Sequence, residues 1–282
     1  MIRAEWLSAV FGVASAASWG AGDFCGGLAA KRAPLLPVVI GSQTCGLLAL
    51  ALAGVIFRDP LPAAASLVWC GVAGLSGAVG LLALYKALAI GRMGLAAPVS
   101  GVLSAAIPVI AGGAVEGMPG WLRLAGFLLA LAGVWLVARG DDAGAFRPLD
   151  LALSVLAGAG FGCFIVIISW SSGQSVFWPL VVARLVSLST MLLVAALGKR
   201  TRALSRRDFP LLVAAGLTDA GGNAFLVLAA HAGRLDVAAV LSSLYPASTV
   251  LLAWLILRER VTRWQFVGLL SVLSAIVMIT AR

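Results

Sequence analysis

The sequence predicts an all-α membrane protein with ten transmembrane helices arranged as two inverted five-helix repeats. The first observation behind this prediction is the composition: 62% of the 282 residues are hydrophobic, only 11% are charged, and the mean hydropathy is +1.07. Soluble domains are close to half apolar and about a quarter charged. The other two observations are a series of apolar runs of membrane-spanning length and a similarity between the two halves of the chain.

The apolar runs are each long enough to cross a bilayer, because a hydrocarbon core about 30 Å thick requires roughly 20 residues of α-helix. Most connections between the runs are short, and the two longest are residues 140–148 and 198–208. The ten predicted spans are residues 5–29, 34–57, 66–90, 95–115, 119–139, 149–171, 176–197, 209–231, 235–257 and 263–280.

The two halves of the chain become similar when the sequence is shifted so that Gly20 aligns with Gly162. Each half then contains five spans, and because five is odd the second half enters the membrane from the opposite side. We therefore divide the chain into a first repeat (1–140), a connecting loop (141–148) and a second repeat (149–282). Inverted repeats are typical of alternating-access transporters, whose substrate site lies near the midplane of the bilayer.

The net charge of +9 comes from 20 Lys and Arg residues against 11 Asp and Glu residues. Most of the basic residues lie on one side of the predicted bundle, opposite the side that holds both termini. Cytoplasmic loops carry an excess of Lys and Arg, so we expect a multi-pass protein of the cell (inner) membrane with both termini outside the cytoplasm. A basic excess of this kind is explained by topology, and no nucleic-acid partner is expected.

Small residues recur at four-residue spacing in the first span, at Gly12, Ala16 and Gly20. The shift between the halves places Gly158 and Gly162 of the sixth span at related positions. Stripes of small residues let helix backbones approach closely in a membrane. Helix packing accounts for both stripes, and a symmetric pivot between the repeats is the alternative.

Polar residues inside apolar spans are the main candidates for a binding site, because a charge there is costly and usually marks a pathway or a pair. Asp219 lies near the middle of the eighth span, with Asn223 one turn away on the same face. Trp19 lies roughly 20 Å into the first span, where its indole N–H needs a partner or a cavity. Asp23 lies one turn beyond Trp19, closer to the end of the span, and is either part of the site or a structural anchor.

A proline follows Tyr245 in the ninth span, at Pro246. Proline removes one hydrogen bond from a helix and frees the carbonyl group one turn earlier for a ligand, a water molecule or a hydroxyl group. The kink serves either packing or binding. The related segment of the first repeat contains Ser100, with Pro98 and Pro108 nearby, so we expect kinked helices in both halves beside a midplane site.

Other polar residues have two interpretations each. Arg184 lies about eight residues into the seventh span, and its side chain either extends to the headgroups or faces the cavity. His231, the only histidine, ends the eighth span, where it is either solvated or part of a proton relay. The four cysteines lie inside apolar runs without a CxxC pair, so the sequence predicts no metal site. No cofactor is predicted either, and proton or ion coupling stays open.

Several motifs follow one another along the chain in a characteristic order. They are Ser18-Trp19-Gly20, Tyr85-Lys86-Ala87-Leu88-Ala89, Ala96-Ala97-Pro98-Val99-Ser100, Leu244-Tyr245-Pro246 and Leu257-Arg258-Glu259-Arg260. Their order and spacing resemble the drug/metabolite transporter superfamily, specifically its EamA-type members. The resemblance implies a secondary transporter with a central cavity, commonly an exporter of amino acids, other metabolites or toxic amphiphiles. Many members are described with both termini in the cytoplasm, opposite to the orientation that the charge distribution predicts here.

Together these features predict a carrier, and not an enzyme, that exports a small metabolite such as an amino acid or an organic cation by alternating access. An intramembrane enzyme and a non-transporting receptor or scaffold are the alternatives; the enzyme requires a nucleophile with a base or a metal cluster. The expected partners are the small-molecule substrate and the lipid bilayer, and both a monomer and a homodimer are open. The predicted substrate-binding residues are Trp19, Asp23, Ser100, Asp219, Asn223 and Tyr245.

Overall fold

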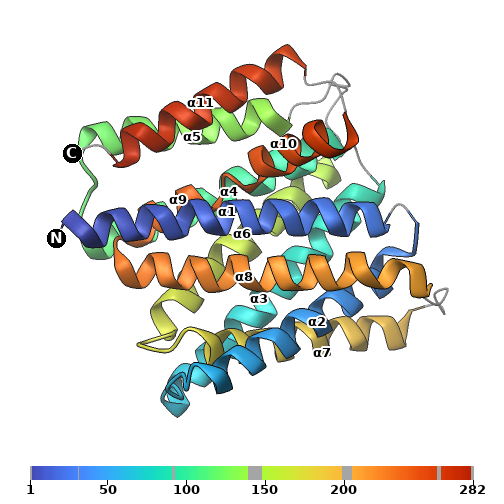
Figure 1. Ribbon diagram of the computed structural model, residues 1–282. Helices are drawn as coiled ribbons and strands as arrows, with labels where there is room; N and C mark the ends of the chain where they lie inside the picture. Colours follow the sequence, from blue (N-terminus) through green and yellow to red (C-terminus); the bar gives the residue numbers. More distant parts are fainter. Residues whose placement is uncertain are drawn as a thin grey trace.

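The computed structural model describes residues 2–30, 32–90, 93–138, 148–198, 205–258 and 262–280, and the secondary structure of these residues is helical throughout, without strands. The all-α prediction is therefore confirmed for this part of the chain. The helices run broadly along one direction, and both termini lie at the same end of the bundle, at the left in Figure 1. We call this end the terminal end and the opposite end the far end.

Five helices precede residue 140, and the remaining helices follow residue 147 among the described residues. The first group is α1 (Ile2–Ala30), α2 (Leu35–Ile56), α3 (Ala64–Ile90), α4 (Met93–Glu116) and α5 (Trp121–Ala138). The second group is α6 (Pro148–Ser171), α7 (Phe177–Leu197), the 3-10 turn η1 (Arg206–Asp208), α8 (Phe209–Ala232), α9 (Leu235–Ser242), α10 (Tyr245–Leu257) and α11 (Arg263–Thr280). Residues 141–147 of the predicted connecting loop lie outside the described residues.

Six stretches of the described chain are long and apolar enough to cross a membrane. They are Leu35–Ile56, Ala64–Leu84, Leu151–Ser171, Phe177–Leu197, Phe209–Ala232 and Leu235–Ile256. Three shorter apolar stretches lie in α4, α5 and α11. The count of ten spans and the inverted repeat therefore stay predictions.

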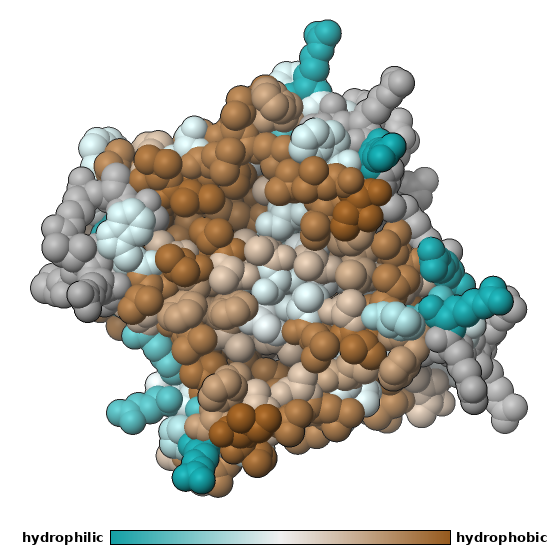
Figure 2. Space-filling view, viewed as in Figure 1, coloured by the Kyte–Doolittle hydropathy of each residue, from teal (hydrophilic) through white to brown (hydrophobic). Residues whose placement is uncertain are grey.

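The outside of the bundle is apolar where a bilayer would surround it. Large side chains such as Leu52, Leu128, Leu193 and Leu273 are exposed. Figure 2 shows hydrophobic residues over the middle of one face and hydrophilic residues mainly towards its edges. An exposed apolar surface of this extent is typical of a membrane or protein interface, and with the spans above it indicates contact with lipid.

The predicted span at residues 235–257 consists of two helices, α9 and α10, separated by Ser243 and Leu244. Pro246 lies in the first turn of α10, where the missing N–H of proline is tolerated because the first turn of a helix has no partner for it. In contrast, α4 continues without a break through Pro98 and Pro108. The two prolines of the first half therefore leave α4 continuous, whereas the helix of the second half is broken just before Pro246.

The helix pairs of the bundle are related by the shift between the two halves. Helix α1 packs against α8, and the related helix α6 packs against α3. Helix α4 packs against α6, and the related helices α9 and α10 pack against α1. Likewise, α3 packs against α7, and the related helix α8 packs against α2. Two further contacts, α5 with α11 and α2 with α7, each join a helix to its own counterpart in the other half. Each pair named here thus has a counterpart in the other half or is its own counterpart.

Glycines allow these related pairs to approach closely. A Cβ atom added to Gly20 would lie 2.8 Å from the carbonyl oxygen of Tyr245 in α10, and one added to Gly162 would lie 2.8 Å from Cβ of Ile107 in α4. Gly12 faces α9 and Gly158 faces α4, and a Cβ at either position would also lie under 3.0 Å from a side-chain atom. Separations this short are essentially never seen for real Cβ atoms, so both interfaces depend on the missing side chains.

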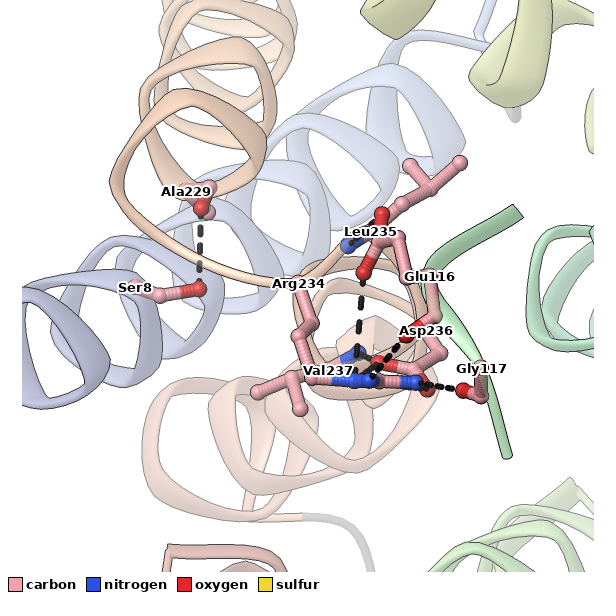
Figure 3. Close-up of polar contacts among 8 residues, drawn as sticks. All are labelled: Ser8, Glu116, Gly117, Ala229, Arg234, Leu235, Asp236 and Val237. Carbon is pink, nitrogen blue, oxygen red and sulfur yellow. Dashed lines mark hydrogen bonds and ion pairs between the residues drawn. The ribbon is translucent and has the colours of Figure 1, made fainter. Parts of the chain in front are cut away.

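A polar cluster joins the two halves at the terminal end (Figure 3). Arg234 donates hydrogen bonds to both carboxylate oxygens of Asp236, and its Nη1 and Nη2 also donate to the carbonyl oxygens of Glu116 (3.2 Å) and Gly117 (2.6 Å). In return, Glu116 Oε1 accepts a hydrogen bond from the backbone N–H of Leu235. We call Glu116, Arg234 and Asp236 the terminal clasp, because they tie the end of α4 to the start of α9.

The electrostatics of the terminal clasp follow from burial. The side chain of Asp236 is 0% exposed, and that of Arg234 is 24% exposed. Hydrogen bonding to Asp236 raises the pKa of Arg234 above its ordinary value, so the guanidinium stays charged. A buried carboxylate of this kind needs its cation, since an unpaired charge in the interior is strongly destabilising.

We predict that Gly20→Ala lowers the stability of the protein by roughly 1–3 kcal/mol, because the new methyl group overpacks the α1–α10 interface. Gly27 lies on the same helix with no neighbouring atom within 4 Å of an added Cβ, so Gly27→Ala is the matched control. The control should be neutral or slightly stabilising, since alanine is the better helix former. Thermal unfolding of the two variants in detergent checks this; equal midpoints would show that the interface does not require glycine.

We also predict that Arg234→Gln destabilises the protein by about 3 kcal/mol, because it leaves Asp236 buried without a cation. The control is Arg58→Gln, which removes the same charge from an exposed arginine in the α2–α3 connection that has no ion-pair partner among the described residues. The control should shift stability by no more than about 0.5 kcal/mol. Chemical unfolding of both variants is the measurement, and similar losses for both would contradict a clasp.

Candidate functional site

A cavity of about 250 Å³ lies inside the bundle and is lined by both halves of the chain. Most of its residues come from near the middle of their helices; those of α1 lie in its second half, towards the far end, and those of α7 in its first half, towards the terminal end. The lining residues are Trp19, Asp23, Gln43, Gly74, Gly77, Leu81, Leu84, Ser104, Phe161, Phe164, Ile165, Leu180, Ala183, Arg184, Ser187, Asp219, Asn223 and Tyr245. The cavity therefore contains five of the six predicted binding residues.

Arg184 and Asp219 form an ion pair in this cavity. Arg184 Nη2 of α7 donates a hydrogen bond to Asp219 Oδ2 of α8. The arginine side chain is 11% exposed and the aspartate side chain 43% exposed. Of the two interpretations of Arg184, the structure supports the one in which the side chain faces the cavity. Asp219 is consequently neutralised by a partner that sequence spacing did not predict.

Asp23 lies at the same cavity without such a partner. Its side chain is exposed, although the residue belongs to the interior face of α1 that lines the cavity. It makes no hydrogen bond or ion pair with any residue that the structure describes, and its main charged neighbour is Asp219, which repels it. Lys86, a basic residue of α3, is exposed and forms no ion pair with it. Pairing as a structural anchor is therefore absent among the described residues.

Asn223 supports Asp219 from one turn further along α8. Its Nδ2 donates a hydrogen bond of 2.8 Å to the backbone carbonyl of Asp219, and the residue is only 7% exposed. This bond fixes the amide group against its own helix while leaving Asn223 at the cavity wall. The predicted pairing of Asp219 and Asn223 on one helical face is observed.

Trp19 and Tyr245 form an aromatic wall. Their ring centroids are 6.1 Å apart and their planes meet at 86°, an edge-to-face arrangement. The indole of Trp19 fits against Gly222, where any Cβ would overlap the ring. Because α9 and α10 are separate, Tyr245 is the first residue of α10, and it lines the cavity there.

Ser100 is the predicted binding residue that does not line the cavity. It is 1% exposed and lies at the α4–α6 interface, where an added Cβ on Gly158 would lie 2.8 Å from the Ser100 carbonyl oxygen. Ser104, one turn further along α4, lines the cavity instead. The close approach allowed by Gly158 explains the difference, because it turns the Ser100 position towards α6.

Several cavity residues were not selected from the sequence. Gln43 in α2 is 7% exposed, and its Oε1 has no hydrogen-bond partner in the part of the chain that the structure describes. Phe161 and Phe164 contribute the apolar wall from α6. An amide side chain in an otherwise apolar span is the signal that could have identified Gln43; the two phenylalanines give no such signal, since aromatic residues are common throughout apolar helices.

His231 lies apart from the cavity, at the end of α8. Its Nε2 is 2.8 Å from Ser172 Oγ, so it joins α8 to the end of α6. Among the described residues, no three His, Cys, Asp or Glu side chains are placed to hold a metal ion. The charged residues that line the cavity, among those described, are Asp23, Arg184 and Asp219.

Comparison with known proteins agrees with this architecture. A solved structure described as "Crystal structure of protein" superposes with a TM-score of 0.81 over 97% of this chain and 98% of its own, at 16% sequence identity. At this identity the likeness shows the fold alone. No curated protein matches the chain.

The second half of the chain carries the family assignment. The model of the EamA-like transporter family matches residues 150–281, which include α7, α8 and the break before α10. This family comprises membrane transporters of the drug/metabolite type, in agreement with the apolar helices described above. Residues 150–281 therefore match the EamA-like transporter family, which confirms the resemblance to that branch of the drug/metabolite transporter superfamily for this part of the chain.

Proposed function

We propose that the protein is a secondary transporter that exports a small metabolite, an amino acid or an organic cation, across the inner membrane by alternating access. The observation that carries this proposal is the cavity shared by both halves, in which Asp23, Arg184 and Asp219 lie inside otherwise apolar helices. Charged groups inside a membrane protein usually mark a solute or ion pathway. The family of residues 150–281 supports the same class of function.

The helix contacts support the inverted-repeat part of the proposal. The major helix pairs have counterparts under the shift between the halves. The related residues Gly20 and Gly162 likewise pack closely against related helices, α10 and α4. With α9 and α10 forming one interrupted span, ten spans and two five-helix repeats are the arrangement we propose. Two similar halves around one site are what rocking-type alternating access requires.

The terminal clasp holds the two halves of the chain together at one end, and we propose that it closes the transporter on that side. It joins α4 to α9 at the terminal end, whereas the cavity lies near the middle of the bundle. Opening towards the terminal side then requires the Arg234 contacts to Glu116 and Gly117 to break. If both termini face out of the cytoplasm, as the charge distribution predicts, the cavity is placed to load solute from the cytoplasm.

Trp19, Asp23, Asp219, Asn223 and Tyr245 are the proposed binding residues. Trp19 and Tyr245 offer aromatic faces to an apolar or cationic group. The two carboxylates interact with a substrate ammonium group or exchange a proton, which is the proposed route for coupling to an ion gradient. Ser104, in place of Ser100, supplies the hydroxyl group from α4.

Solute flux tests the proposed function. The purified full chain, reconstituted into sealed liposomes, should carry at least one labelled amino acid or organic amine at a rate that saturates with concentration. Protein-free liposomes are the first control, and the Arg58→Gln variant, which leaves the cavity intact, is the second. Flux no faster than in protein-free vesicles across both solute classes would contradict a transporter.

A pair of variants separates the transport role of Asp219 from its structural role. Asp219→Asn leaves Arg184 without its counter-ion and should cost about 2 kcal/mol of stability, less than for a fully buried pair because Asp219 is partly exposed. The double variant Arg184→Gln/Asp219→Asn removes both charges and should regain most of that stability.

Both variants should lose transport, because the charged site is gone in each. Unfolding midpoints and liposome flux are measured on the same preparations. Normal flux in Asp219→Asn would remove Asp219 from the site, and an equally unstable double variant would show that the ion pair is not the reason for the loss of stability.

A further inference from the structure

The charged groups of the cavity do not balance. Among the described lining residues there are two carboxylates, Asp23 and Asp219, and one guanidinium, Arg184. Arg184 is already paired with Asp219. The remaining charge is therefore the negative charge of Asp23, which has no hydrogen-bond or ion-pair partner among the described residues. This carboxylate is exposed within a cavity whose walls are largely apolar, and such walls strengthen its attraction for a compensating positive charge.

A second, independent feature of the cavity also requires a hydrogen-bond donor. Gln43 is 7% exposed, and its Oε1 is buried without a hydrogen-bond partner among the described residues. Buried side-chain polar atoms nearly always have a partner, so this amide oxygen is available to a donor that comes within its reach. Asp23 from α1 and Gln43 from α2 both line the cavity, and a ligand there meets the Gln43 oxygen once the amide group turns towards it.

The rest of the lining defines the body of the ligand. Phe161, Phe164, Leu81 and Leu84 are apolar, and Trp19 adds an aromatic ring. The volume of about 250 Å³ equals roughly eight water molecules at about 30 Å³ each, which suits a compact ligand with a single small ring. The cavity therefore combines the unpaired carboxylate of Asp23 with a wall in which apolar and aromatic side chains outnumber polar ones.

We propose that this cavity binds a small monocationic amine with an apolar body, whose ammonium group pairs with Asp23 and donates a hydrogen bond within reach of Gln43 Oε1. This deepens the proposed function, on which it rests, by selecting the organic cation over the amino acid. An amino acid carries a carboxylate as well, and the positive charge of Arg184 is already balanced by Asp219. A monocation brings the lining to neutrality, whereas a zwitterion leaves the charge of Asp23 uncompensated.

Direct binding to the detergent-solubilised full chain tests the proposal. The probe is 2-phenylethylammonium, compared with 2-phenylethanol, which lacks the charge, and phenylalanine, which adds a carboxylate. Isothermal titration calorimetry on the unmodified protein should show the amine binding at least about tenfold more tightly than either comparison compound, as expected for a charge-assisted hydrogen bond. Equal affinities for the three compounds, or no binding of the amine, would overturn the proposal.

Variants then locate the ammonium group. Asp23→Asn should weaken amine binding by about 10- to 100-fold, and Gln43→Leu by about three- to tenfold. The charge-matched control is Asp208→Asn at the start of α8, a carboxylate outside the cavity, which should bind the amine like the unmodified protein. An unchanged affinity in Asp23→Asn, or an equal loss in Asp208→Asn, would overturn the assignment.

The outcomes distinguish this inference from the transport function. Flux of an amino acid without binding of the amine would leave the transporter intact and reject the amine site. Binding of the amine that depends on Asp23, without flux of any solute, would keep the site and reject transport.

Discussion

The ion pair between Arg184 and Asp219 is the interaction on which the rest of the site depends. An apolar bundle can hold charged groups only if they are paired or if a ligand completes them, because the cost of a lone charge is several kcal/mol or more. Arg184 and Asp219 satisfy this requirement between α7 and α8. Because this pair is neutral overall, Asp23 is the carboxylate of the cavity whose charge a bound cation or a proton would balance. Asp219 can take part in binding only as a member of its pair with Arg184.

Much of the fold follows from hydropathy and spacing alone. The apolar runs predict the helices closely, and the alignment of Gly20 with Gly162 predicts which helices are related. Chain spacing did not predict that α9 and α10 are separate while α4 continues through Pro108. Proline removes the same hydrogen bond in either place, and whether the helix then ends depends on the helices packed around it, which a local sequence does not contain.

Site residues could be predicted from the sequence when their position deep inside an apolar span was itself unusual for the residue type. Trp19 and Asp219 are conspicuous at the middle of apolar runs, and both line the cavity. The partner of Asp219 could not be derived, because Arg184 lies on a different helix and either orientation of its side chain fits the spacing. Ser100 shows the opposite case: its hydroxyl and depth suit a site, yet the close approach of Gly158 places it at a helix interface. Which face of a helix lines a cavity is determined by packing against several neighbours.

The central claim is that the cavity between the two halves is reached from each side of the membrane in turn. Ser187 lines this cavity and carries no charge, so Ser187→Cys can report its accessibility after the four native cysteines are replaced by alanine. The direct measurement is the reaction of this cysteine, in sealed vesicles, with a membrane-impermeant thiol reagent added to one side or the other. Alternating access predicts modification from both sides; modification from a single side, or from neither, would contradict it.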